Sequence, residues 1–424
     1  MSYQRIKGTQ DFYDQKSLKL RYVEKKMFEI LQKYNYSEMI TPIFENTELF
    51  RRSVGDDTDI VKKEMYTFND KSDRSITLRP EGTASIVRSY LENKLYANSF
   101  ALNKYYYFGP MFRYERPQSG RFRQFHQFGV EAFGESSYLL DADIIISAYN
   151  VFLNLKIKNI KLHINSIGDE VSRKKYAESI KTYFSKYKNM LCEDCNRRLE
   201  SNPLRILDCK IDKKLEIMSN IPKISSFLTD ESKMYFNNLI EILDSFKIPF
   251  IIDLNLVRGL DYYTDTVFEF VSESEDEFNG LTICAGGKYA NLVNQMGGPN
   301  ISGIGYAFGI ERVISIMDKQ NLWDNLERSV DFVIIGLDEN AKKIGLEIAL
   351  MLRNNDFIVD MDYKNTKLKP QFNLADKLKP KATIIIGENE VKEKAVMVKD
   401  SQGGVQEKIL ISKLVIYLKE NYNK

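Results

Sequence analysis

Histidine and cysteine are scarce in this chain of 424 residues, which contains two of the first and four of the second. With only His126 and His163 available, a histidine-rich metal site is excluded, and a Ser-His-Asp triad has almost no choice of base. Four cysteines in so long a chain do not make a disulfide framework. Any chemistry of this chain must therefore depend on Arg, Glu, Gln and Tyr side chains.

Long apolar runs are also missing, since no stretch approaches the roughly 20 residues of a membrane-spanning helix. The first ten residues, MSYQRIKGTQ, are polar and do not resemble a secretory signal. We therefore expect a cytoplasmic protein without a membrane partner. The net charge is only +2, so nucleic acid would have to bind to local basic patches. No GxxxxGK[ST] loop is present and no βαβ unit carries GxGxxG, which argues against P-loop and Rossmann sites.

Hydrophobic periodicity divides the chain into parts of different character. Residues 1–325 mix helical periods with strand-like alternation and predict an α+β catalytic domain, an antiparallel sheet flanked by helices. Residues 169–247 interrupt this domain with lysine-rich sequence of mostly helical period, and we call this predicted helical segment the insertion. Residues 330–424 alternate strands and helices and predict a separate small α/β domain.

Local signals predict several element boundaries. Residues 17–34 are expected to form a helix with Ser17 as its N-cap, and residues 406–421 a helix at the end of the chain. Strand-like Met39-Ile40 runs into Pro42, which cannot donate to a ladder and so predicts an edge or an interface.

A long hairpin is predicted for residues 104–133, and it interleaves arginines with phenylalanines. Strand alternation places Arg121 and Arg123 on one face, and Arg113 can face the same way. A solvated hairpin is the simpler interpretation. Yet arginines that clamp phosphates beside rings that stack on a base suit a nucleotide. Gln127, four residues before Glu131, lies on the same strand face as that carboxylate.

Two further segments carry isolated charges next to glycine-rich or helical sequence. In GIGYAFGIERV, residues 303–313, Arg312 lies in the first turn of a predicted helix and opposes the helix dipole, which makes sense if it reaches a phosphate. Packing of a glycine-rich strand against a helix is the alternative. Glu81 precedes a helix predicted from Thr83 onward, where a carboxylate is often only a cap.

The segment LVRGLDYYT, residues 256–264, follows a strand predicted for residues 249–257. Burying a cation beside such a strand is costly unless an anion meets it, so Arg258 should have an anionic partner. Tyr262 and Tyr263 stand next to it with two phenol groups. A turn is predicted at Gly286-Gly287.

These segments resemble the motifs of a known family. EMITPIFENTELF, FRYERPQSGRFRQFHQFGVE and GIGYAFGIERV are similar to motifs 1, 2 and 3 of class II aminoacyl-tRNA synthetases. LVRGLDYYT and AGGKYANLV resemble the two signature peptides of the bacterial histidyl-tRNA synthetase family. The tail, with LADKLKPKATIIIGENE, resembles that family's anticodon-binding domain, so the resemblance covers nearly the whole chain.

The resemblance implies a ligase that activates L-histidine with ATP to histidyl-adenylate and transfers it to the 3′ end of tRNA-His. It also implies Mg²⁺ on the outer phosphates and a homodimer. Arg258 and Arg113 are implied as catalytic residues. The implied histidine-binding residues are Glu81, Gly82, Thr83, Arg113, Gln127, Glu131, Arg258, Tyr262, Tyr263 and Tyr289. The implied ATP-binding residues are Arg113, Arg121, Phe125 and Arg312.

The sequence departs from the family pattern at one place. The second signature usually reads Gly-Gly-Arg-Tyr-Asp-Gly, whereas here Lys288 replaces the arginine and loses its bidentate fork, and Ala290 removes a carboxylate. A non-catalytic histidine-binding regulatory paralogue remains an alternative, although such relatives tend to lose LVRGLDYYT and the anticodon domain. A nucleic-acid-binding module without activation is a third interpretation.

Three features concern metal and tRNA. Cys192, Cys195 and Cys209 form a C-x₂-C pair plus one cysteine, which is one ligand short of a structural zinc site, so no metal site is predicted. The lysine-rich segments 173–188 and 363–381 are predicted to contact tRNA phosphates rather than only solvent. Residues 116–119 are the expected contact with the acceptor end.

Overall fold

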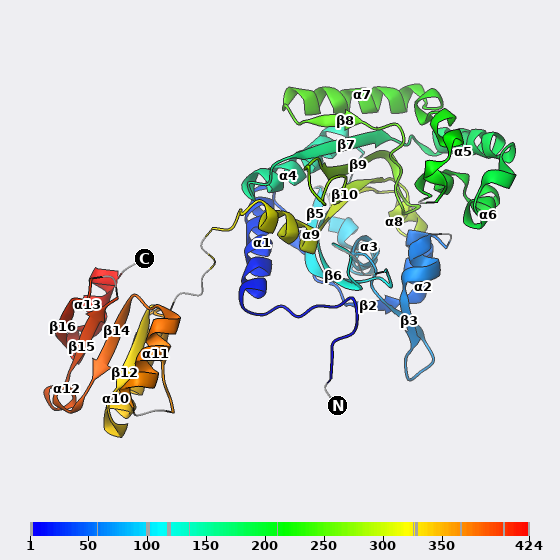
Figure 1. Ribbon diagram of the computed structural model, residues 1–424. Helices are drawn as coiled ribbons and strands as arrows, with labels where there is room; N and C mark the ends of the chain where they lie inside the picture. Colours follow the sequence, from blue (N-terminus) through cyan, green and yellow to red (C-terminus); the bar gives the residue numbers. More distant parts are fainter. Residues whose placement is uncertain are drawn as a thin grey trace. The chain divides into compact units, whose positions relative to one another are not determined.

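The computed structural model describes residues 3–56, 58–98, 102–116, 120–134, 136–209, 211–324, 326, 330–364, 367–401 and 403–422. The chain divides into two compact units, residues 1–324 and residues 325–424 (Figure 1). We describe each unit by itself. Among the helices of the described residues, none is long and apolar enough to cross a membrane.

The described residues of the first unit form an eight-stranded sheet with the order β1-β5-β6-β11-β10-β9-β7-β8. Its strands are β1 (Ser37–Glu38), β5 (Asn103–Phe112), β6 (Gln124–Gly134), β7 (Ile160–Ser166), β8 (Phe250–Ile252), β9 (Thr264–Ser272), β10 (Thr282–Tyr289) and β11 (Ser302–Gly309). Neighbours are antiparallel from β5 to β7 in this order, and only the edge pairs β1–β5 and β7–β8 are parallel. The predicted α+β class with an antiparallel sheet flanked by helices is confirmed.

Helices cover one face of this sheet and enclose the main apolar core (Figure 1). They are α1 (Asp14–Lys33), α4 (Tyr138–Asn154), α7 (Asp230–Ser245) and α9 (Ile310–Lys319). Strand alternation sends Ile304, Tyr306 and Phe308 of β11 into this core, where each is buried. The odd-numbered residues between them, glycines and one alanine, therefore face the opposite side.

The remaining elements of the first unit border that opposite side or belong to the insertion. The bordering elements are β2 (Phe44–Asn46), α2 (Thr47–Val54), β3 (Tyr66–Asn69), β4 (Ser75–Leu78), α3 (Thr83–Glu92) and α8 (Leu292–Gln295), with β2, β4 and β3 forming a small sheet. The insertion contains α5 (Glu170–Ser185), α6 (Glu193–Ser201), α7 and short 3₁₀ turns that include η4 (Pro203–Asp208) and η5 (Asp212–Lys214). Its α5, α6 and 3₁₀ turns enclose an apolar cluster of their own around Tyr176, Phe184 and Leu199.

The second unit is built on a sheet with the order β13-β12-β14-β15-β16 among its described residues. Its elements are β12 (Phe332–Gly336), α10 (Glu339–Arg353), β13 (Val359–Met361), α11 (Leu368–Leu378), β14 (Ala382–Ile386), α12 (Glu388–Glu393), β15 (Ala395–Asp400), β16 (Gln406–Leu410) and α13 (Ile411–Tyr422). The first three strands of the sheet are parallel, and β15 and β16 are antiparallel additions. An apolar core of its own packs between this sheet and its helices.

Some predicted boundaries are wrong. Helix α1 begins at Asp14, so Tyr13 rather than Ser17 is its N-cap. The helix predicted for 406–421 begins only at Ile411, because residues 406–410 pair with β15 as an exposed edge strand whose polar pattern mimics a helix. Met39 lies beyond the two-residue strand β1, although its N–H still donates to Tyr106 O. The edge position predicted for this strand is confirmed.

The turn predicted at Gly286-Gly287 is also wrong, since both glycines lie inside β10. A Cβ on Gly286 would lie 2.2 Å from the carbonyl oxygen of Gly305 on the neighbouring strand. The pair therefore marks close approach between strands rather than a reversal of the chain. The strand predicted to end at residue 257 ends at Ile252, so Arg258 lies in irregular structure.

Glycines on the open face of β11 make room for side chains that lie flat on the sheet. A Cβ on Gly303 would lie 2.0 Å from Cε2 of Tyr289, and one on Gly305 would lie 2.0 Å from Oε2 of Glu131. With a larger residue at position 303 or 305, the side chain of Tyr289 or Glu131 could not keep its position.

We predict that Gly303→Ala destabilises the first unit by about 1–3 kcal/mol, because the added methyl group collides with the fully buried ring of Tyr289. Urea titration followed by tyrosine fluorescence measures the change in the free energy of unfolding. Gly309→Ala on the same strand is the matched control, since its Cβ would meet nothing nearer than Cδ of Arg312 at 3.5 Å. Equal effects of the two substitutions would contradict the prediction.

Candidate active site

A cavity of about 580 Å³ opens over the glycine-rich face of the sheet. The predicted site residues that line it are Glu81, Thr83, Arg113, Arg121, Phe125, Gln127, Glu131, Arg258, Tyr262, Tyr263, Tyr289 and Arg312. The exception is Gly82, which lies against Tyr107, where a Cβ would come within 2.3 Å of the ring. Residues separated by more than two hundred positions are therefore brought into one hollow.

One end of the cavity is a buried polar pocket around Glu131. Thr83 Oγ1 donates to Glu131 Oε1 at 2.6 Å, and the Tyr289 hydroxyl donates to Oε2. Tyr262 packs beside Tyr263 with ring centroids 4.6 Å apart and meets the edge of Tyr289 at 5.6 Å. Burial raises the pKa of Glu131 to about 8, although the two hydroxyl groups oppose that rise. The pocket can therefore present this carboxyl group either as an acceptor or as a donor.

Glu81 caps the helix that starts at the wall of this pocket. Its two carboxylate oxygens accept the backbone N–H groups of Thr83 and Ala84, each at 2.8 Å. Burial raises the pKa of Glu81, and these two N–H bonds oppose the rise. The simpler of the two sequence interpretations, a helix cap, describes this geometry, and the same carboxylate still lines the cavity.

Arg258 meets Glu269, a residue that the sequence analysis did not single out. The guanidinium donates to Glu269 Oε1, and Thr282 Oγ1 donates to the other carboxylate oxygen at 2.6 Å. Burial disfavours the charge of Arg258, but Glu269 and the two neighbouring tyrosines outweigh it and raise its pKa. The signal that was overlooked is a lone carboxylate in the otherwise apolar strand segment VFEFV.

Two buried polar atoms in the cavity wall have no hydrogen-bond partner among the described residues: Gln127 Oε1 and Arg258 Nε. Leaving a buried donor or acceptor unpaired costs about 1–3 kcal/mol. One atom is an acceptor and the other is a charged donor, so side-chain movement that exposed them would give a cationic and an anionic part of a ligand separate partners.

The other end of the cavity carries three more arginines. Arg113 donates to Pro80 O at 2.8 Å and lies over the Phe125 ring at 5.4 Å. Arg121 pairs with Glu115 at 3.2 Å. Arg312 Nε donates to Gly120 O at 3.1 Å; its burial, together with the nearby cations, lowers its pKa. This excess of positive charge beside an aromatic ring can bind a polyanion with a planar group.

Some sequence expectations are not met at this site. Arg123 does not share the face of Arg121, because its guanidinium stacks 4.0 Å from the Tyr114 ring and does not line the cavity. Lys288, which was not among the predicted site residues, does not line the cavity and lies over the Tyr235 ring at 4.2 Å and 3.7 Å from Asp265. The replacement of arginine by Lys288 in the second signature therefore affects the contacts with Tyr235 and Asp265 rather than the cavity wall. Of the expected acceptor-end contact at 116–119, residues 117–119 lie outside the described residues.

The insertion forms part of the cavity wall. Arg205, Cys209 and Lys213 contribute to its wall. Asp261 accepts hydrogen bonds from Asn202 at 3.0 Å and from two nitrogens of Arg205 at 2.9 Å. The segment that carries Arg258 and the two tyrosines is thus attached to the insertion.

Comparisons with known proteins agree along the whole chain. A profile of the family described as Histidyl-tRNA synthetase matches residues 8–178 and 190–313, and one described as Anticodon binding domain matches residues 331–421. The chain is 45% identical over 420 residues to a histidine–tRNA ligase of Geobacillus sp. (strain WCH70), which covers 99% of both chains.

Two solved structures extend the comparison. Apo S. aureus histidyl-tRNA synthetase is similar with a TM-score of 0.85 and 39% identity, over 99% of this chain and 100% of that one. A structure described as an ATP phosphoribosyltransferase regulatory subunit/histidyl-tRNA synthetase from Bacillus halodurans C has a TM-score of 0.64 at 18% identity, over 91% of this chain and 99% of that one. At that identity the likeness extends to the fold alone.

We predict that the free energy of unfolding of the first unit decreases as pH rises, because the pKa of the buried Glu131 is raised in the folded chain. Its pKa increases from 4.5 to about 8 on folding, so between these values the folded chain keeps a proton that the unfolded chain has lost. Glu131→Gln should flatten this slope by up to about 1.4 kcal/mol per pH unit. Urea midpoints of the first unit between pH 5 and pH 8 measure it, with the exposed Glu275→Gln as control. An unchanged slope in Glu131→Gln would contradict the assignment.

Proposed function

Because the chain belongs to the histidyl-tRNA synthetase family, we propose that it activates L-histidine with ATP and transfers the histidyl group to the 3′ end of tRNA-His. The observation that carries the proposal is one cavity whose wall contains both the buried polar pocket around Glu131 and four arginines, Arg113, Arg121, Arg258 and Arg312. A small polar amino acid suits the first part and a nucleoside triphosphate suits the second.

The pocket around Glu131 is proposed to hold histidine. A neutral imidazole has one N–H donor and one acceptor nitrogen, so Glu131 and a hydroxyl of Tyr262 or Tyr263 can satisfy both. Tyr289 keeps Glu131 in place through its hydrogen bond. Amino acids without a matching ring would leave these buried groups unpaired, which gives about 10⁴–10⁵-fold discrimination in sites of this kind.

The α-ammonium group of histidine is proposed to lie against Gln127. Gln127 lines the cavity and its Oε1 is a buried acceptor without a partner among the described residues, and Glu81 lines the same cavity and supplies negative charge. Thr83 bridges the two halves, because its hydroxyl bonds Glu131 while its N–H bonds Glu81. Gly82 contributes space rather than a contact, since it lets Tyr107 approach.

ATP is proposed to occupy the arginine-rich end. Phe125 offers its ring to adenine, Arg121 and Arg312 face the outer phosphates, and Arg113 faces the α-phosphate and the carboxylate of histidine. Burial lowers the pKa of Arg312, and repulsion by the neighbouring Arg121 and Arg113 lowers it further. Binding of a polyanion relieves this repulsion.

The proposed chemical step is displacement at the α-phosphorus. A carboxylate oxygen of histidine forms the new bond to phosphorus while the bond to pyrophosphate breaks. The attacking carboxylate is already ionised, so no general base is needed, and catalysis consists of positioning and of neutralising charge on the α-phosphate. Arg258 and Arg113 supply that charge, and Arg258 exchanges Glu269 for the phosphate.

Mg²⁺ is proposed to accompany ATP. Magnesium sites usually combine substrate phosphates with one or two carboxylates, and the cavity wall contains Glu115 and Glu269 outside the histidine pocket. Both carboxylates pair with arginines in this structure, so the donor set fits once phosphates take those arginines. The ion would neutralise charge on the outer phosphates.

The second unit and the insertion are proposed to bind tRNA in the cytoplasm. The profile match to an anticodon-binding domain supports this for residues 331–421. The lysine-rich residues 173–188 lie on α5 and just after it, and they are proposed to contact phosphates.

The regulatory alternative is less well supported. The chain retains Arg258 in a complete signature peptide and a second unit, and its 45% identity over full length is to a ligase. The relative whose description includes a regulatory subunit is 18% identical.

A homodimer is proposed through the motif 1 segment. Ile40 is 80% exposed, Ile43 44% and Phe44 52%, so three large apolar side chains near the sheet edge face solvent. Contiguous exposed apolar surface of this kind marks protein interfaces. A second copy of the chain would cover it.

We predict histidine-dependent exchange of pyrophosphate into ATP in the presence of Mg²⁺, and absence of such exchange would refute the proposed function. Arg258→Ala should lower the exchange rate by at least about 10²–10³-fold, because charge on the α-phosphate is no longer neutralised. Histidine affinity should change little. Arg258→Lys should restore only part of the rate, since the planar fork is lost.

The matched control is Arg123→Ala in the hairpin, whose guanidinium stacks on Tyr114 outside the cavity. It should exchange at close to the wild-type rate. If Arg258→Ala lost histidine affinity with little loss of turnover, its role would be binding rather than catalysis.

We predict that Ile40→Asp converts a dimer into a monomer at micromolar concentration, because a buried carboxylate would lack a partner in the interface. Sedimentation velocity measures the change. Met234→Asp, at an exposed position on α7, should leave the dimer intact. A wild-type chain that sediments as a monomer at the same concentration would contradict the proposed homodimer.

A further inference from the structure

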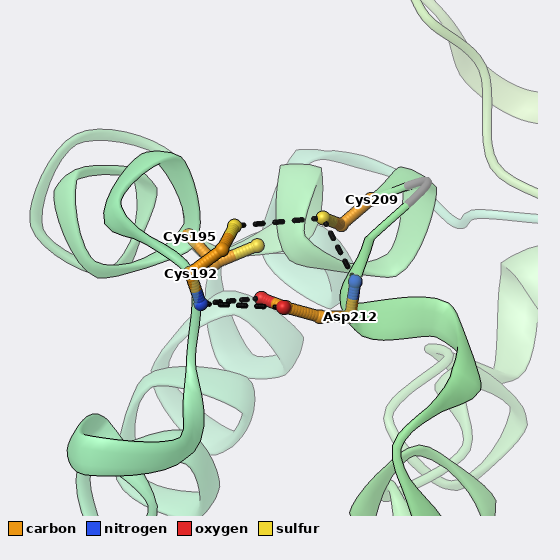
Figure 2. A group of neighbouring side chains, drawn as sticks. All are labelled: Cys192, Cys195, Cys209 and Asp212. Atoms are coloured by element: carbon orange, nitrogen blue, oxygen red, sulfur yellow. Dashed lines mark hydrogen bonds between the residues drawn. The ribbon is translucent and has the colours of Figure 1, made fainter.

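Four potential metal ligands converge in the insertion at a place that the proposed chemistry does not use (Figure 2). Cys192 immediately precedes α6 and Cys195 lies in its first turn. Cys209 follows η4, and Asp212 begins η5. Figure 2 shows the three sulfur atoms and the carboxylate directed into the space between these elements. The fourth ligand that the cysteine spacing lacks is therefore supplied by Asp212.

The ligand atoms are close enough together for a zinc centre. All four lie within 4.8 Å of one another, and the sulfurs of Cys192 and Cys209 are 3.8 Å apart. Zn–S bonds of about 2.3 Å in a tetrahedral centre place two sulfur ligands about 3.8 Å from each other. This one pair therefore already has the required separation, and any wider pair would close in on the ion.

The surroundings of the four groups also resemble those of metal ligands. The backbone N–H of Asp212 donates to the sulfur of Cys209 at 3.3 Å, and both Asp212 oxygens accept the N–H of Cys192 at 3.0 and 3.2 Å. Such bonds orient ligands and leave their remaining electron pairs free for a metal. They link the two sides of the cluster even without an ion.

Burial distinguishes this cluster from cysteines that merely fill a core. Cys195 is fully buried, Cys209 is 4% exposed and Asp212 is 2% exposed. Apolar packing would account for the two cysteines, which belong to the apolar cluster of the insertion. It does not account for a buried carboxylate beside them, which forms no ion pair with the described residues and whose burial a cation would offset.

We propose that this cluster binds one Zn²⁺ ion through Cys192, Cys195, Cys209 and Asp212. Thiolates favour zinc, and a carboxylate oxygen is an accepted fourth ligand in a tetrahedral site. No coordination position remains open, so the ion is structural rather than catalytic.

The ion would fix the part of the insertion that touches the active-site segment. Asn202 and Arg205 lie in the chain between Cys195 and Cys209, and both hold Asp261. Zinc ties the two ends of this stretch together and so restricts the positions of both side chains. Cys209 itself lines the cavity, which places the ion next to its wall.

The test is metal binding by the full-length chain under reducing conditions. The protein is stripped with a chelator, reloaded with Zn²⁺, freed of excess metal and measured by mass spectrometry for zinc. We expect about one zinc per chain, and Co²⁺ in its place should give the visible bands and thiolate charge-transfer absorption of a tetrahedral site. Less than about a tenth of an equivalent in the wild-type chain would overturn the proposal.

Variants identify the ligands. Cys195→Ser and Asp212→Ala should each lose most of the zinc, whereas Cys284→Ala should retain it, because Cys284 lies in β10 outside the cluster. Retention of full occupancy by Asp212→Ala together with an unchanged Co²⁺ spectrum would exclude the carboxylate as ligand. Since wild-type metal content decides the central question, a variant that fails to fold leaves the test intact.

Thiol counting separates zinc from oxidation. The chain denatured without reductant should show four free thiols, in agreement with four unpaired cysteines. A disulfide between Cys192 and Cys209 would lower the count by two and overturn the proposal. Hydrogen exchange then reports the consequence, since removal of zinc should increase exchange in residues 193–201 and 256–264 but not in the second unit.

Discussion

The partly buried ion pair between Arg258 and Glu269 is the interaction on which the rest of the site depends. The two side chains are only 16% and 18% exposed, so each charge is stabilised by the other, and removing either partner would leave a poorly solvated charge without a counter-ion. The pair attaches an irregular segment to β9, and Thr282 holds the carboxylate from the neighbouring strand. An anionic substrate group can take the place of Glu269, so the same pairing that stabilises the empty cavity prepares it for a phosphate.

The active-site segment, residues 256–264, is held by contacts to both the sheet and the insertion. These contacts explain why the insertion matters to the cavity. Arg258 attaches the segment to the sheet, while Asp261 attaches it to Asn202 and Arg205. Tyr262 and Tyr263 follow directly after Asp261, and Arg258 lies over the ring of Tyr263, so both anchors constrain the ring pair. A zinc ion at the base of the insertion would stiffen the second anchor, so a structural metal and a substrate pocket would be mechanically connected without sharing a ligand.

Strand alternation makes one sheet serve two purposes. On β11, Ile304, Tyr306 and Phe308 enter the core, while the glycines between them leave space for Glu131 and Tyr289. On the second face, Glu131 lies against Gly305 and is itself buried, and this burial raises the pKa of its carboxyl group. The alternation of side chains along β11 therefore determines both the packing of the core on one face and the space for Glu131 and Tyr289 on the other.

The α+β class, the arginine hairpin, the helix periods and many of the residues that line the cavity could be predicted from the sequence, because periodicity and short motifs are local. The contacts between distant residues could not be predicted and became visible only in the folded chain. Long-range packing brought Glu269 on β9 to Arg258 in its irregular segment, and it placed Arg123, which precedes β6, on the ring of Tyr114. The same long-range packing placed Asp212 among three cysteines that the sequence spacing left incomplete. A residue's partner across the fold is fixed by chain topology, and no local pattern encodes it.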